Sequence, residues 1–150
     1  MALAFHGVIR ASLDVDLLLL GKPVLLAPLG KAFRERGLEA EERTGDSEDP
    51  IPALLRVRDR YGNQLDVLAG LRGLDPTTAS RVVIADHEGQ KLPFVGLEDL
   101  VAMKLFAGNP QDVEDARRLL AVSEDSADRT LIRRLAQGYG EPCLRVLEDL

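Results

Sequence analysis

Hydrophobic residues alternate with polar ones in the first half of the chain and recur every three or four positions in the second half. Alternation is typical of half-buried strands, whereas the longer period is typical of amphipathic helices. The first half therefore predicts a strand over 12–20 and a hairpin over 53–60 and 64–70 around Gly62. A second hairpin is predicted over 80–86 and 90–95, with its turn at residues 87–89.

Helical spacing and glycine stops predict the remaining elements. A short helix is expected over 1–6 and another over 24–36, the first ending at Gly7 and the second at Gly37. Residues 39–50 are almost wholly polar and acidic, and predict a surface loop. Further helices are expected over 97–107, 110–122, 128–137 and 141–150. Strands come first and helices last, an order that favours an α+β fold.

Composition narrows the function classes. The 150 residues suit a single sizeable core, and the net charge of −6 argues against nucleic-acid binding by bulk electrostatics. The single cysteine, Cys143, excludes an internal disulfide and a cysteine metal cluster, so a reducing, cytoplasmic location is expected. Neither a targeting segment nor a membrane span is evident, so no membrane partner is expected.

Two aspartates interrupt the otherwise apolar segment RASLDVDLLLL at residues 10–20. Strand side chains alternate between faces, so Asp14 and Asp16 share one face while Leu13, Val15 and Leu17 point into the core. Asp66, between Leu65 and Val67, has the same setting in QLDVLAG. If the two strands are neighbours, three carboxylates meet on one face of the sheet.

Carboxylates this close need a neutralising partner, because like charges raise each other's pKa. Mg²⁺ takes oxygen ligands of this kind, and such ions support phosphoryl transfer. The alternative is that Asp14, Asp16 and Asp66 are surface residues on the solvated face of a sheet. An EF-hand is excluded, because leucines follow the acidic pair where its loop needs a polar residue and glycine.

Lys104 lies on the apolar stripe of its predicted helix, together with Leu97, Leu100 and Val101. In the next helix Asp112 and Asp115 face inward in the same way, so an antiparallel pair of helices would bring them to Lys104. One interpretation is a partly buried salt bridge that holds the helices together. The other is that Lys104 reaches the acidic site and binds a triphosphate, and the two can both hold.

Three segments together resemble the minimal nucleotidyltransferase superfamily, and most closely its AbiEii-like branch of toxin–antitoxin and phage-defence modules. They read AFHGVIRASLDVDLLL, GNQLDVLAG and GLEDLVAMKLFAGNPQDVEDARRLL. The resemblance covers residues 1–122 and implies a nucleotidyltransferase-like core there, a mixed sheet with helices packed on one side. Residues 123–150 are then expected as C-terminal helices packed on this core.

The resemblance also implies a site, in which metal (Mg²⁺ or Mn²⁺) and an NTP bind together. The family's Arg-x-Thr often precedes its acidic pair, as Arg10-Ala11-Ser12 does here. Its metal ligands and catalytic acids correspond to Asp14, Asp16 and Asp66, and its nucleotide contacts to Arg10, Ser12 and Lys104. The implied reaction is in-line attack by a protein, RNA or small-molecule hydroxyl on the α-phosphate, with pyrophosphate leaving.

The chain departs from the family pattern at two places. Asn109 stands where the family often has arginine. The family's Gly-Gly or Gly-Ser turn, whose free N–H groups hold phosphate, would fall immediately before Met1. We therefore expect weak phosphate binding, and a sheet edge that is left uncovered and invites a homodimer.

A second function stays open beside the enzyme: a catalytically impaired, antitoxin-like or regulatory interaction module on the same fold, with a toxin or antitoxin as its partner. A hydrolase has little support, because His6 and His87 are the only histidines and no nucleophile elbow occurs. His6 follows a helix end and is expected to be structural. The arginine pairs at 117–118 and 133–134 are expected as surface charge, with contact to a nucleic-acid acceptor as the weaker alternative.

Overall fold

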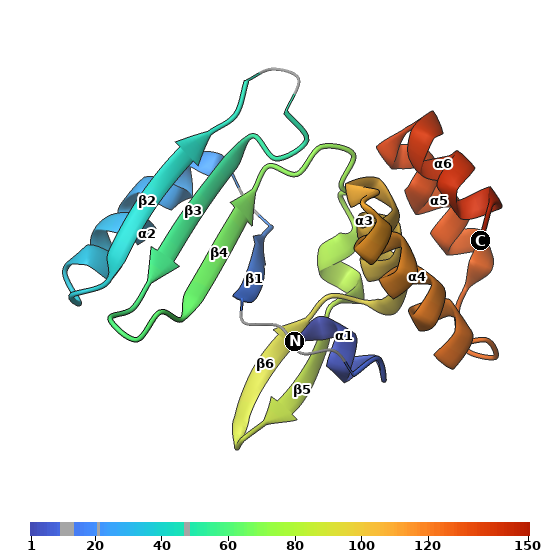
Figure 1. Ribbon diagram of the computed structural model, residues 1–150, viewed down its shortest axis with the longest axis horizontal. Helices are drawn as coiled ribbons and strands as arrows, with labels where there is room; N and C mark the ends of the chain where they lie inside the picture. The colour runs from blue at the N-terminus through green and yellow to red at the C-terminus, as the bar shows by residue number, and fades with distance from the viewer. Residues whose placement is uncertain (10–13, 21, 47–48) are drawn as a thin grey trace. The chain divides into compact units, whose positions relative to one another are not determined.

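The computed structural model describes residues 1–9, 14–20, 22–46 and 49–150, for Asp14 the backbone alone (Figure 1). The chain divides into two compact units. The sheet unit comprises residues 11–72 together with Met1, and the helical unit comprises residues 2–10 and 73–150. Each unit has its own hydrophobic core.

In the described part of the sheet unit, four strands form one mixed sheet in the order β1-β4-β3-β2. The central pair, β3 and β4, is the hairpin that the Gly62 turn predicts, and β1 lies parallel to β4. The strands are β1 (Asp14–Leu19), β2 (Glu39–Thr44), β3 (Ala53–Arg58) and β4 (Gln64–Ala69). With helices following in the rest of the chain, the α+β prediction with a mixed sheet is confirmed.

One face of this sheet is buried under α2 (Leu26–Arg34), which follows the short 3₁₀ helix η1 (Pro23–Leu25) and packs on β2 and β3 (Figure 1). Gly30 allows the close approach, since a Cβ there would lie 3.1 Å from Leu55 Cδ1. The helix ends at Gly37, whose φ of 77° suits glycine, as predicted. The buried cluster consists of Leu26, Ala53, Leu55, Val57, Val67 and Ala69.

The loop predicted for residues 39–50 is wrong over its first half, because Glu39–Thr44 form strand β2. β2 pairs with β3 through its backbone and is the last strand of the sheet. Its side chains are exposed apart from the half-buried Ala40. An edge strand with so little burial carries almost no hydrophobic alternation, and charged side chains are a usual protection of such an edge.

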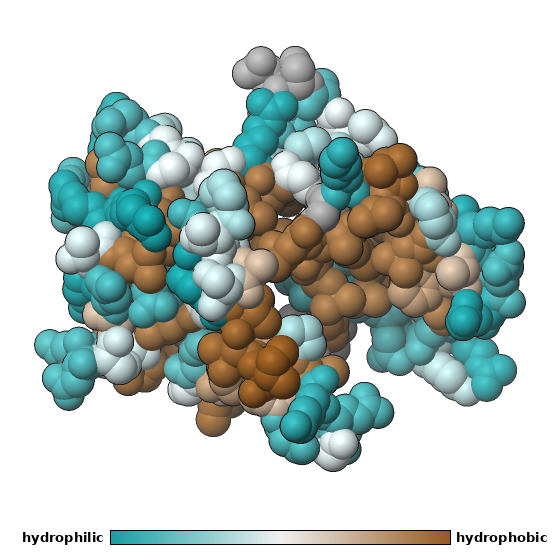
Figure 2. Space-filling model, turned by 180° about the vertical axis from the view of Figure 1, so that it is seen from behind, coloured by the Kyte–Doolittle hydropathy of each residue, from teal (hydrophilic) through white to brown (hydrophobic). Residues whose placement is uncertain are grey.

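The predicted burial of Leu17 is also wrong: its exposed fraction is 48%. β1 is an edge strand and α2 packs on β2 and β3, so the α2 side of β1 is covered only in part. Val15 is half-buried, Leu19 packs on the core cluster, and Leu13 lies outside the described residues. Hydrophobic side chains are exposed on the surface of this unit (Figure 2), among them Leu17, Leu20, Val24 and Leu25.

The helical unit begins with α1 (Ala2–Phe5) and continues from residue 73 into helices that pack on α3. Its hairpin turns at Glu88 and Gly89, both with positive φ, as a two-residue hairpin turn requires. The elements are η2 (Thr78–Arg81), β5 (Val83–His87), β6 (Gln90–Phe94), α3 (Leu97–Ala107), α4 (Pro110–Val122), α5 (Arg129–Tyr139) and α6 (Glu141–Glu148). The predicted helices and second hairpin are therefore confirmed, with boundaries shifted by at most a few residues.

The core of this unit lies between α3, α4, α5 and α6, where Val101, Leu119 and Ile132 are completely buried. His6 Nε2 donates a hydrogen bond to the Val95 carbonyl, 2.8 Å away, in the structural setting expected for it. The assignment of residues 1–122 to one nucleotidyltransferase-like domain stays a prediction. Among the described residues, no helix is both long and apolar enough to cross a bilayer.

Cys143 provides a probe of this core. Its side chain is buried on α6, and burial raises the pKa of the thiol from 9.0 to about 11. The thiolate is the reactive form, so at pH 8 the native thiol should react with Ellman's reagent about a hundredfold more slowly than in denaturant. The release of thionitrobenzoate with and without guanidinium measures the ratio. Equal rates would mean that α6 does not stay packed in solution.

Candidate functional site

The strand register places the predicted acids of the sheet unit side by side. Asp16 of β1 is the Cα partner of Asp66 of β4, and Asp66 in turn is opposite Arg56 of β3. Glu41 of β2 completes this row across the sheet. All four alternate with the residues that pack under α2, so they belong to the opposite face, here called the polar face.

Asp66 is buried and is held by a bidentate ion pair. Arg56 Nε lies 2.9 Å from Asp66 Oδ1, and Arg56 Nη2 lies 2.7 Å from Oδ2. Gln64 donates to Oδ2 at 3.4 Å and itself accepts a hydrogen bond from Arg58 at 3.0 Å. Both carboxylate oxygens of Asp66 are therefore satisfied within the chain, as a buried charge requires.

Sequence reasoning missed Arg56, although a signal for it existed. Arg56 stands between Leu55 and Val57 in the same way that Asp66 stands between Leu65 and Val67. Once the hairpin around Gly62 is paired, the two polar positions fall opposite each other. A charged residue of each sign on one face then indicates an ion pair.

The carboxylates present have the chemistry of a site for Mg²⁺ or Mn²⁺. Asp16 is exposed, and Oδ1 of Asp66 accepts one hydrogen bond from Arg56, which leaves a lone pair on that oxygen for a metal, whereas Oδ2 accepts from both Arg56 and Gln64. Among the described side chains, no three His, Cys, Asp or Glu gather as a metal site. The third predicted ligand is Asp14, whose backbone pairs with Gln64 and whose side chain lies outside that description.

Of the three predicted nucleotide contacts, only Lys104 belongs to the described residues. Arg10 and Ser12 lie outside the described residues. Lys104 belongs to α3 of the helical unit, where it pairs with Asp112 and, at 3.2 Å, with Asp115 of α4. The predicted pairing of Lys104 with these acids is confirmed. Its second role, contact with a triphosphate, stays a prediction.

The Lys104 pair is built into the helix junction. The side chain of Asp115 is completely buried, and it also accepts a hydrogen bond from Gln111 at 3.2 Å. Asn109, at the position where the family often has arginine, caps α4 by accepting from the backbone N–H of Asp112. Its side-chain amide also donates to the Asp112 carboxylate. The departure at Asn109 is therefore a helix cap that joins the same polar cluster.

A second buried acid, Asp99, was not singled out from the sequence. It accepts from Arg81 Nε at 2.6 Å, Arg81 Nη2 at 2.8 Å and Thr78 Oγ1 at 2.8 Å. The hydrogen bonds and charge of Asp99 raise the pKa of Arg81 above its usual value. The pair attaches η2 to the first turn of α3. The available signal was α3 itself, because a helix that is apolar on most sides is buried and any acid in it needs a partner.

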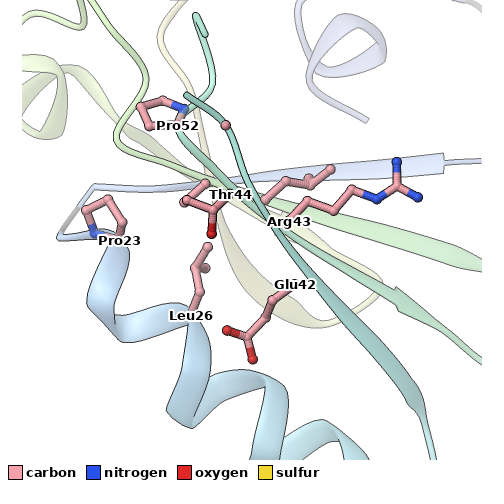
Figure 3. Close-up of a pocket in the computed structure, with 9 residues that line it drawn as sticks. Pro23, Leu26, Glu42, Arg43, Thr44 and Pro52 are labelled. Atoms are coloured by element: carbon pink, nitrogen blue, oxygen red, sulfur yellow. The ribbon is translucent and has the colours of Figure 1, made fainter. Parts of the chain in front are cut away.

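A shallow depression of 240 Å³ lies elsewhere in the sheet unit, where α2 begins beside β2 and β3. Figure 3 shows Leu26 of α2 pointing toward Thr44 of β2, while Arg43 extends away from them. The depression is smaller than typical ligand pockets of about 300–1,000 Å³. Its lining includes none of the predicted site residues, and we assign it no role.

The Lys104 cluster makes a testable contribution to stability. Lys104→Met should lower the free energy of unfolding by about 3 kcal/mol, because it leaves Asp115 buried without its cation. Urea denaturation followed by circular dichroism at 222 nm measures the change. Lys31→Met is the control, since its pair with Glu35 is exposed and worth at most about 1 kcal/mol. A neutral or stabilising effect of Lys104→Met would contradict a structural role for Lys104 at the junction of α3 and α4.

No protein-family model matches this chain, and no curated protein matches it significantly.

Proposed function

We propose that this chain is a metal-dependent nucleotidyltransferase, which transfers a nucleoside monophosphate from an NTP to a hydroxyl of a protein, an RNA or a small molecule. The observation that carries the proposal is the register of β1 with β4. It sets Asp16 beside Asp66 on the face of the sheet opposite α2. Two strand-borne carboxylates that share a face are a suitable arrangement for divalent cations and phosphate chemistry.

Each residue has a distinct part in this proposal. Asp14, Asp16 and Asp66 would hold Mg²⁺ or Mn²⁺, and Arg10, Ser12 and Lys104 would contact the NTP. A bound divalent ion would offset the negative charge of the carboxylates and of the phosphate oxygens in the transition state. Arg56 fixes the rotamer of Asp66 through two hydrogen bonds.

In the proposed reaction, the acceptor oxygen forms a bond to the α-phosphorus while the bond from this phosphorus to the bridging oxygen of the β-phosphate breaks. Pyrophosphate leaves with that bridging oxygen. The acceptor hydroxyl loses its proton, and the exposed carboxylate of Asp16 can take it up.

A non-catalytic interaction module is the second candidate, and one observation favours it. The Arg56 guanidinium neutralises Asp66 within the chain itself, so Asp66 needs no metal ion for stability. An antitoxin-like or regulatory partner would then bind a face of fixed charge.

Transfer of label from an NTP distinguishes the two candidates. The protein is incubated with Mg²⁺ or Mn²⁺, a cell lysate and each α-³²P-labelled NTP in turn. If the chain is the enzyme, at least one nucleotide gives a labelled acceptor. Asp16→Asn and Asp66→Asn should each lower the labelling rate by about a hundredfold or more, because loss of such charge stabilisation costs several kcal/mol of barrier.

Glu41→Gln is the matched control, because Glu41 lies in the same row but on β2, at the far edge of the sheet. It should label at the wild-type rate. Circular dichroism checks that each variant is folded, and exposed Asp16 is the safer of the two positions to change. Absence of label with all four nucleotides would contradict the enzyme and leave the interaction module as the better proposal.

A further inference from the structure

Arg56 and Asp16 belong to the two strands that flank Asp66. β4 lies between β1 and β3, so Asp16 and Arg56 are on opposite neighbours of Asp66 in the same row. Both oxygens of Asp66 accept a short hydrogen bond from the Arg56 guanidinium, at 2.9 and 2.7 Å. The Asp66 carboxylate is therefore turned toward Arg56.

A metal ion shared by Asp16 and Asp66 would require the opposite orientation of the Asp66 carboxylate. It needs an oxygen of Asp66 on the β1 side, and it brings a double positive charge close to the guanidinium. Screening between them is weak, since only 23% of the Arg56 side chain and 12% of the Asp66 side chain are exposed. The guanidinium and the ion thus contend for one carboxylate.

We propose that Arg56 is an internal counter-cation, which competes with the divalent metal for Asp66 and sets the metal concentration at which the site fills. This inference rests on the proposed function, because it concerns the same carboxylates. At low metal concentration the ion pair neutralises Asp66 and keeps its carboxylate bound to Arg56. As the metal concentration rises, Asp66 exchanges the guanidinium for the ion.

The alternative role for Arg56 is positioning. In that role, the two hydrogen bonds from its guanidinium would orient Asp66 for the metal. The two roles predict opposite signs. A competitor weakens metal binding, so its removal tightens binding, whereas an orienting residue strengthens binding and its removal weakens it. Arg58 is a matched comparison, because it lies two residues away on the same strand and face and contacts Gln64 in place of Asp66.

Titration with Mn²⁺, followed by electron paramagnetic resonance of the free ion, measures the sign directly. Arg56→Gln should bind Mn²⁺ about tenfold more tightly than the wild type, because a nearby positive charge is removed. Arg56→Lys keeps the positive charge but loses the bidentate hydrogen bonds to Asp66. Its affinity for Mn²⁺ should therefore lie between those of the wild type and Arg56→Gln. Arg58→Gln should stay within about twofold of the wild type. Unchanged or weaker binding by Arg56→Gln would overturn the proposal.

Thermal unfolding gives a second readout on the same variants. Without metal, Arg56→Gln should have a lower Tm than the wild type, because Asp66 is left buried without a cation. Mn²⁺ should raise the Tm of this variant by more than that of the wild type. If Arg56→Gln does not fold, Arg56→Lys carries the test, and its failure to bind Mn²⁺ more tightly than the wild type would overturn the proposal.

Asp16→Asn separates failure of this inference from failure of the proposed function. If Asp16→Asn binds Mn²⁺ as well as the wild type, the carboxylates are not the metal site and both proposals fail. If Asp16→Asn binds more weakly but Arg56→Gln does not bind more tightly, only the competition fails. If Arg56→Gln binds Mn²⁺ more tightly than the wild type, and the double variant with Asp16→Asn loses this gain, the result supports both the competition and the proposed function.

Discussion

The burial of one sheet face under α2 is the constraint on which the arrangement of the polar face depends. Leu55 and Val67 must face α2, because their side chains form the centre of the core. Strand side chains alternate with a period of two, so their neighbours Arg56 and Asp66 are forced onto the other face. A slip of one residue would move both charges into the core, which makes this register strongly favoured.

The same constraint determines the electrostatics of the candidate site. Three charged residues in adjacent strands, Asp16, Asp66 and Arg56, share one row. The central acid has one partner of its own sign and one of opposite sign, and it binds the latter. A site of this kind has two ways to balance its charge, one with the arginine and one with a metal ion. The nucleotidyl transfer that we propose, and its proposed control by Arg56, both depend on that choice.

The helical unit also has buried acids that need a cation, in two places. Asp99 and Asp115 are buried acids, and each is held by a cation from a neighbouring segment, Arg81 and Lys104 respectively. Such pairs contribute little net stability over an apolar core, but losing one partner is costly because the other charge stays buried. They therefore fix which segments pack together: η2 on α3, and α3 on α4.

Local patterns in the sequence were sufficient for the helices, the two hairpins and the pairing of Lys104 with Asp112 and Asp115. These features depend on spacing within a helix or across a short turn, which the order of residues determines directly. The sequence also placed Asp14, Asp16 and Asp66 on strands. Only the tertiary structure decided that β1 pairs with β4 in the register that sets Asp16 beside Asp66.

Three further features were decided by tertiary structure alone: β2 as a strand, the exposure of Leu17, and the fork between Arg56 and Asp66. β2 is held mainly by backbone hydrogen bonds to β3, and Ala40 is its one half-buried apolar side chain, so its sequence carries almost no strand pattern. Leu17 is exposed because α2 packs on β2 and β3, a packing choice that the sequence of β1 does not contain. The order of residues along a strand determines which of them share a face. The partners of that face depend on contacts between segments that are distant in the chain.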